Sequence, residues 1–211
     1  MARTIRTKVY KFNELSQEAQ QKAINYWRNE NNDCEYQTYF DEITDSVKAV
    51  VELFNLKTGK VYRDIRTSHI DDNILELKGV RLYKYIVNNY YNDLFKPKYI
   101  KTLDRPVKWK QFLCKIHKGR NGEYTQIYSK LRKENCCVLT GVCYDDDILA
   151  PVYEFLKRPD KNTTFADLIS DIEAEINKTY TDTENYINSD EYIKETIEAN
   201  EYEFLKDGKR F

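Results

Sequence analysis

The sequence lacks the short motifs by which many enzymes and membrane proteins are identified. Its 6 glycines form neither a Walker loop nor a G-x-G-x-x-G turn, which argues against the common nucleotide-binding folds. No hydrophobic run approaches the length of a membrane span, and no apolar stretch follows the charged opening of the chain. We therefore expect a cytoplasmic protein without a signal peptide, a membrane partner or a cofactor.

Histidine and cysteine are too sparse for a familiar catalytic or disulfide framework. The 2 histidines, His69 and His117, do not lie in sequence contexts typical of nucleophilic catalysis. The 5 cysteines have no framework spacing, so reduced thiols in a cytosol are the simplest interpretation. Cys114, His117, Cys137 and Cys143 supply the ligand number of a structural zinc site, but their spacing matches no common zinc motif. These features favour a protein that is not an enzyme.

Charge, by contrast, is abundant and is divided along the chain. From Lys96 to Lys133 there are 12 Lys and Arg residues against 2 acids, and from Asp145 to Glu203 there are 17 acids against 5 Lys and Arg. The net charge of −1 conceals this division. Such segregation indicates a polyanionic partner for one half, a basic protein for the other, or pairing of the two halves.

The basic segment interleaves cations with aromatic residues, as nucleic-acid-binding segments do. Its cations could contact phosphates, while Trp109 and Tyr124 could stack on bases. The apolar residues also recur at helical spacing, so the rings could equally be core and the cations a solvated face. The candidate residues for binding phosphate or an acidic partner are Lys108, Trp109, Lys110, Lys115, Lys118, Arg120, Lys130, Arg132 and Lys133.

The acidic half offers candidates for binding a basic partner. Asp145, Asp146 and Asp147 could instead ligate Mg²⁺ or cap a helix, and capping is favoured because no distant acid-rich strand completes a nuclease site. The other acids follow Ile and Leu stripes, as an ordinary solvated helix face also would. The candidate set is Asp145, Asp146, Asp147, Asp167, Asp171 and Glu175.

Hydrophobic periodicity predicts an α+β fold that is mostly helical, as a single domain over residues 1–211. A small antiparallel sheet would include a strand over Thr4 to Phe12 and a C-terminal hairpin on the Asp207-Gly208 turn. The segments 61–65 and 74–77 are short strand candidates. Helices are expected over 16–29, 36–54, 82–94 and 145–156, after Thr163 or Thr164, and from about Ser189, with two short ones in the basic segment.

Three stretches of the chain resemble a family of uncharacterised bacteriophage proteins. They are VYKFNELSQEAQQKA at 9–23, CVLTGVCYDDD at 137–147 and IEANEYEFLKDG at 197–208. The resemblance supplies no catalytic residues. It implies a small accessory protein, of the kind that blocks host defences by binding a nuclease effector or by sequestering a nucleotide signal.

We therefore expect a phage binding protein that inhibits a host defence factor stoichiometrically in the bacterial cytoplasm. An anti-CRISPR role against a nuclease effector is one form of this hypothesis, and the 18 tyrosines suit such an interface, although an AT-rich genome would also enrich tyrosine. The alternative is a nucleic-acid-binding regulator that uses Lys96 to Lys133. A third interpretation is a nucleotide-sequestering protein, or a metal-dependent enzyme acting on nucleic acid through Asp145 to Asp147.

Overall fold

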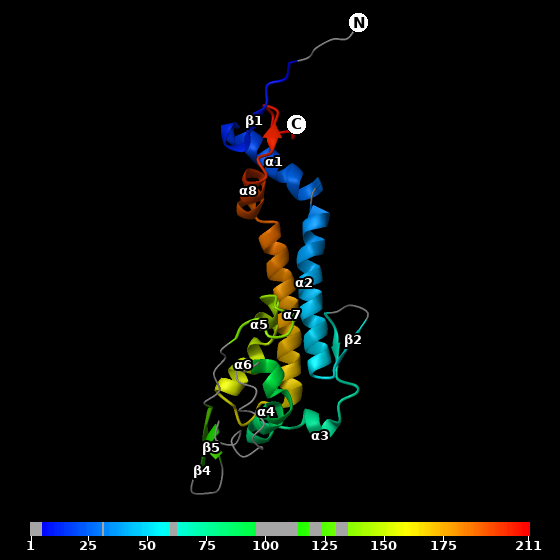
Figure 1. The fold of residues 1–211 in the computed structure, drawn as a ribbon, viewed down its shortest axis with the longest axis vertical. Helices are drawn as coiled ribbons and strands as arrows, with labels where there is room; N and C mark the ends of the chain where they lie inside the picture. The colour runs from blue at the N-terminus through cyan, green and yellow to red at the C-terminus, as the bar shows by residue number, and fades with distance from the viewer. Residues whose placement is uncertain (1–5, 31, 60–62, 96–113, 119–123, 130–134) are drawn as a thin grey trace. The chain divides into compact units, whose positions relative to one another are not determined.

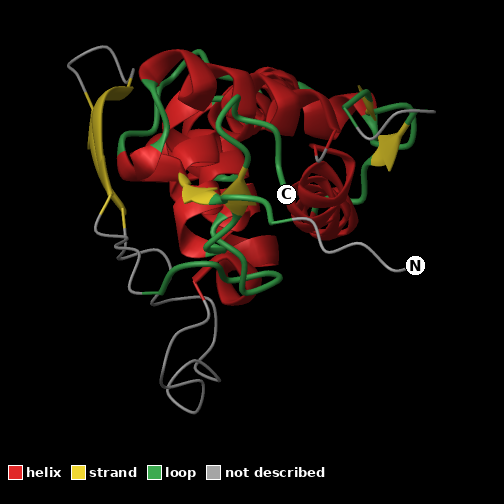
Figure 2. Cartoon of the chain, turned by 90° about the horizontal axis from the view of Figure 1, so that it is seen from above, coloured by secondary structure: helices red, strands yellow, loops and turns green. Residues whose placement is uncertain are grey.

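The computed structural model describes residues 6–30, 32–59, 63–95, 114–118, 124–129 and 135–211. Helices predominate among them, and the strands form antiparallel pairs (Figure 2). The predicted α+β, mostly helical fold is therefore confirmed. The chain divides into two compact units: unit 1 combines Met1–Phe40 with Thr181–Phe211, and unit 2 is Asp41–Tyr180.

Unit 1 is built on two capped helices from opposite ends of the sequence. Helix α1 (Gln17–Glu30) begins after Ser16, whose Oγ accepts a backbone hydrogen bond from its first turn at 3.3 Å. Helix α8 (Asp190–Ala199) begins in the same way after Ser189, at 3.2 Å. Both caps satisfy an amide that lacks a partner within the helix. The two helices lie side by side (Figure 1).

A small sheet brings the two termini of the described chain together in unit 1. Strand β1 (Tyr10–Lys11) pairs antiparallel with β6 (Glu203–Phe204), so the predicted sheet is confirmed. The strand is shorter than expected: residues 6–9 lie outside it, and a 3₁₀ helix, η1 (Phe12–Glu14), follows it at once. The core beneath it consists of Phe12, Leu15, Ala19, Ala23, Ile24, Trp27, Ile193, Ile197 and Phe204.

Long periodic helices supply the core of unit 2. Helix α2 (Asn32–Leu53) and helix α7 (Phe165–Ile187) each contribute to both units, and α4 (Gly79–Phe95) lies within unit 2. All three match predicted helices. Their apolar stripes are buried, with exposure of 3% or less at Ile43, Val47, Val50, Leu82, Ile86, Leu168, Ile169, Ile172 and Ile176.

The predicted helix over 145–156 is divided into α5 (Tyr144–Ile148) and α6 (Ala150–Lys157). The division falls at Leu149, two residues before Pro151 in the first turn of α6. Proline has no amide hydrogen to continue the helical ladder, which accounts for the interruption. None of the helices within the described ranges is long and apolar enough to cross a membrane.

The short elements correct several sequence predictions. Strand β2 (Lys57–Thr58) pairs with β3 (Ile65–Arg66). The predicted strand at 74–77 is wrong: its first two residues end helix α3 (Asp72–Leu75), and its last two are not strand. Asp71 explains the helix, because its carboxylate accepts a hydrogen bond from the Asn73 amide at 2.8 Å as an N-cap.

The prediction of two short helices in the basic segment is wrong. Strands β4 (Cys114–Lys118) and β5 (Tyr124–Ser129) form an antiparallel pair there. Apolar residues in segments this short fit either period, and a helix of one or two turns recovers little of its nucleation cost. The β-branched and aromatic residues Ile116, Tyr124, Thr125, Ile127 and Tyr128 favour strands instead.

Candidate functional site

The predicted basic site lies mostly outside the described residues. This applies to Lys108, Trp109, Lys110, Arg120, Lys130, Arg132 and Lys133. Lys115 and Lys118 lie on β4, in register with Tyr128 and Tyr124 of β5. A phosphate-binding role for the segment stays a prediction.

Asp145, the first of the three consecutive aspartates, is an internal carboxylate with no exposed surface. Its Oδ2 accepts hydrogen bonds from the amides of Leu139 and Thr140 at 2.8 and 2.7 Å, and its Oδ1 accepts one from the Thr140 hydroxyl at 2.8 Å. That hydroxyl lies 3.3 Å from the buried Ser46 hydroxyl on α2. Asp145 therefore organises the loop before α5 and presents no charge to a partner.

Asp146 extends this arrangement, while Asp147 is exposed. The Asp146 carboxylate accepts a hydrogen bond from the Cys137 amide at 3.1 Å. Burial raises the pKa of the Cys137 thiol to about 12, and hydrogen bonding with Cys143 and Cys136 acts in the same direction. A thiol with so high a pKa stays protonated at neutral pH and is a poor nucleophile.

The zinc hypothesis involves both this loop and β4. Within the residues whose side chains the structure describes, no group of three or more His, Cys, Asp and Glu is placed to hold a metal ion. Cys114 and His117 lie on β4, where the structure gives the backbone course only. A zinc site that uses them stays a prediction.

The acids predicted on the long helix have separate local roles along α7. Asp167 forms a reciprocal cap with Thr164, each side chain accepting a hydrogen bond from the other's backbone amide at 2.8 and 3.0 Å. Hydrogen bonding from the Thr164 amide, and secondarily from its side chain, lowers the pKa of the Asp167 carboxyl. Glu175 forms an ion pair with Lys178 at 2.6 Å. Asp171 is exposed. The helix therefore uses two of its three candidate acids for its own structure.

A different surface, in unit 1, has the features of an interface. Tyr186, near the end of α7, is 53% exposed although its ring packs against Tyr192 of α8 with centroids 4.8 Å apart. Tyr192 in turn contacts Tyr39 of α2, with centroids 6.3 Å apart and hydroxyl oxygens at 3.3 Å. The exposed ring is thus the outer member of a packed tyrosine cluster.

Acids lie beside these rings on both helices. Asp182 precedes Tyr186 by four residues and Glu195 follows Tyr192 by three, so each acid is a neighbour of a ring on the helix surface. Both acids are exposed, and neither forms an ion pair with a cation in the described part of the chain. We name Asp182, Tyr186, Tyr192 and Glu195 the tyrosine–acid face.

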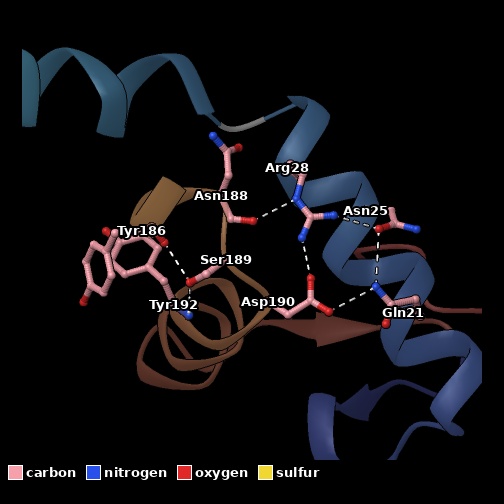
Figure 3. Close-up of polar contacts among 8 residues, drawn as sticks. All are labelled: Gln21, Asn25, Arg28, Tyr186, Asn188, Ser189, Asp190 and Tyr192. Atoms are coloured by element: carbon pink, nitrogen blue, oxygen red, sulfur yellow. Dashed lines mark hydrogen bonds and ion pairs between the residues drawn. The ribbon is translucent and has the colours of Figure 1, made fainter. Parts of the chain in front are cut away.

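The turn between α7 and α8 fixes this face (Figure 3). The Ser189 hydroxyl donates to the Tyr186 carbonyl at 2.7 Å while it caps α8. From α1, Arg28 donates through Nε to the Asn188 carbonyl at 3.1 Å and pairs with the Asp190 carboxylate. The hydrogen bond from Arg28 is the main reason that the pKa of Asp190 is lowered.

Sequence reasoning missed the tyrosine–acid face because its two tyrosines belong to different helices. One signal was present: the buried stripe of α7 continues through Thr183 and Ile187, so Tyr186 lies out of phase with it. An aromatic residue on the polar side of an amphipathic helix does not serve the hydrophobic core, so its position there indicates another role. The partner ring was not identifiable without the turn that joins the helices.

The four residues of the tyrosine–acid face are two tyrosines and two acids, so the face itself contains no histidine or cysteine of the kind that serves as a base or nucleophile. No protein-family model matches the chain, and neither does any of the curated proteins or solved structures with which it was compared.

Proposed function

We propose that the protein is a non-enzymatic binding protein whose tyrosine–acid face captures a basic surface on a partner protein. The observation that carries this proposal is Tyr186, an exposed ring packed against Tyr192, with Asp182 beside it forming no ion pair within the described residues. In its sharper form, the partner is a host defence nuclease, as the bacteriophage resemblance suggests.

Two physical arguments support an interface at this face. Tyrosine contributes large contact area at low conformational cost, and a ring already packed against a neighbour loses little further entropy on binding. Acids beside it complement the cationic surface that any nuclease needs for its polyanionic substrate. A protein bound to such a surface blocks access of the nucleic-acid substrate, so it inhibits stoichiometrically and without turnover.

Affinity capture from host lysate tests the proposal. Tagged wild-type protein and the variants Tyr186→Ala and Glu195→Lys would be compared after nuclease treatment, with Tyr26→Ala as the matched control. Tyr26 is also an exposed helical tyrosine of unit 1, at 43%, but it does not belong to the tyrosine cluster. We expect a defined protein that wild type and Tyr26→Ala retain and that both face variants lose.

Other outcomes separate the competing functions. Recovery that collapses after nuclease treatment would instead indicate nucleic-acid binding through the basic segment. Equal retention by wild type and both face variants would overturn the assignment of the face. Loss of a target's activity at substoichiometric dose would show turnover, which a binding protein does not have.

A further inference from the structure

We propose that a basic pocket in unit 2 binds a small molecule carrying two or more adjacent phosphate groups. The cavity has a volume of about 880 Å³, within the usual range for ligand sites. Four cations line it: Lys78, Arg81, Lys84 and Lys161. This site is independent of the tyrosine–acid face, and neither proposal relies on the other.

The four cations come from two separate segments of the chain. Arg81 and Lys84 are three residues apart in the first turns of α4 and are neighbours on its surface, and Lys78 immediately precedes the helix. Lys161 comes from the connection between α6 and α7. Because the cavity is lined from both segments, a bound anion would be contacted from two sides.

Backbone contacts hold these two segments together. The Phe165 amide donates to the Leu77 carbonyl at 3.0 Å, the Gly79 amide donates to the Thr163 carbonyl at 3.4 Å, and Lys78 and Thr164 form an antiparallel bridge. These bonds fix the base of Lys161's segment against the start of α4. The pocket therefore exists before any ligand binds, which lowers the entropic cost of binding.

Gly79 permits this close approach. Its φ of +56° lies in the left-handed region that glycine adopts without strain, and an added Cβ would lie 3.2 Å from both Cα and O of Lys161. Asp160 shapes the same connection by accepting hydrogen bonds from the amides of Asn162 and Thr163, at 2.7 and 3.2 Å. The wall that carries Lys161 is thus specified by the local sequence.

The charge of the pocket points to a multiply charged anion. Among the described residues, Glu76 is the one acid that lines the pocket, and none of the four cations forms an ion pair with an acid there. Like charges gathered without partners repel one another, so an anion that bridges them is bound more strongly than by separate surface lysines. A di- or triphosphate group carries several adjacent negative charges, whereas a single carboxylate carries one.

Calorimetric titration of the full chain with inorganic tripolyphosphate and with ATP tests this proposal. We expect saturable one-to-one binding to both, weakened about 10-fold for the variants Arg81→Gln and Lys161→Gln through loss of a charge-assisted contact. Lys57→Gln is the matched control, since Lys57 is an exposed unit 2 lysine outside the pocket, and we expect a change below about 2-fold from it. Binding should also weaken with rising salt.

Competition between the two probes, and a comparison of their affinities, identify the ligand. If tripolyphosphate displaces bound ATP, the pocket binds the phosphate chain, which is the part that free polyphosphate and nucleotides have in common. Tighter binding of ATP than of tripolyphosphate assigns the nucleotide as the source of those phosphates. The proposal is overturned if neither probe binds, if Lys57→Gln weakens binding as much as Lys161→Gln, or if single-stranded DNA binds and tripolyphosphate does not compete.

Discussion

At the scale of single residues, the buried carboxylate of Asp145 shows how an acidic sequence can be structural. A charge without exposed surface is tolerated only where hydrogen bonds replace its water shell, and here two amides and a hydroxyl do so. The neighbouring Asp147 differs from it by exposure alone and not by residue type. In this run of three aspartates, the first residue is therefore buried and the last is exposed.

The substitution Asp145→Asn should destabilise unit 2. An amide nitrogen would face donors that now meet a carboxylate oxygen, and we expect a loss of about 2–4 kcal/mol in the free energy of unfolding. Urea denaturation would measure it. Asp171→Asn, at an exposed site on α7, is the control and should cost less than about 0.5 kcal/mol. Equal losses in the two variants would show that Asp145 has no special structural role.

At the scale of elements, the C-terminal turn rests directly on α1. Gly208 has a φ of +89°, and an added Cβ would lie 2.1 Å from the carbonyl oxygen of Ala19. Gly141 has a similar φ of +91° but has no atom within 4 Å of such a Cβ. Gly141 thus needs glycine only for its left-handed backbone, whereas Gly208 needs it both for the backbone and for the close contact with α1.

Alanine substitution at these glycines should give unequal results. Both variants carry backbone strain of about 1 kcal/mol, but Gly208→Ala must also displace the turn from α1, so we expect a total of about 2–4 kcal/mol. Chemical denaturation of both variants would compare them. If Gly141→Ala proved as costly as Gly208→Ala, the contact between the turn and α1 would not explain the glycine.

The ion pair between α1 and α8 gives unit 1 a dependence on acid pH. The hydrogen bond from Arg28 lowers the pKa of Asp190, with burial opposing it. A carboxyl whose pKa is lowered by folding stabilises the protein above its unfolded pKa of about 4, and this contribution is lost as the pH falls below that value. Because both side chains are partly exposed, at 30% and 48%, we expect less than about 1 kcal/mol.

Melting temperatures of wild type and Asp190→Asn, measured between about pH 6 and pH 3, test this dependence. The difference between the two proteins should be present at pH 6 and should shrink toward pH 3. Glu198→Gln, an exposed acid of α8 with no cation paired to it in the described residues, should show no such trend. A difference that stayed constant with pH would contradict the role of the ion pair.

The long helices were predictable from sequence, whereas most of the short elements, apart from the pairing of β1 with β6, were not. Helices α1, α2, α4, α7 and α8 combine apolar stripes with caps such as Ser16 and Ser189, and each signal agrees with the others. The hairpin of β4 and β5 was predicted as helices because a few apolar residues fit both periods. Its strands are specified by pairing with each other, which a local pattern does not reveal.

At the scale of the whole molecule, the candidate sites depend on residues that only the fold brings together. The tyrosine–acid face joins Tyr186 and Tyr192 across the turn between two helices. The basic pocket joins Lys161 to Lys78, which lies 83 positions earlier in the sequence. Segment charge predicted that the protein binds charged partners, and the acidic segment 145–203 contains the tyrosine–acid face, whereas the basic segment 96–133 contains none of the cations of the pocket.

The central claim is that the tyrosine–acid face binds a partner protein. The most direct measurement is calorimetric titration of the purified partner, identified by capture, into wild type and into Tyr186→Ala. We predict a one-to-one complex with wild type and a dissociation constant at least about 10-fold higher for Tyr186→Ala, as expected for a central interface tyrosine. Equal affinity of the two proteins for the partner would contradict the account.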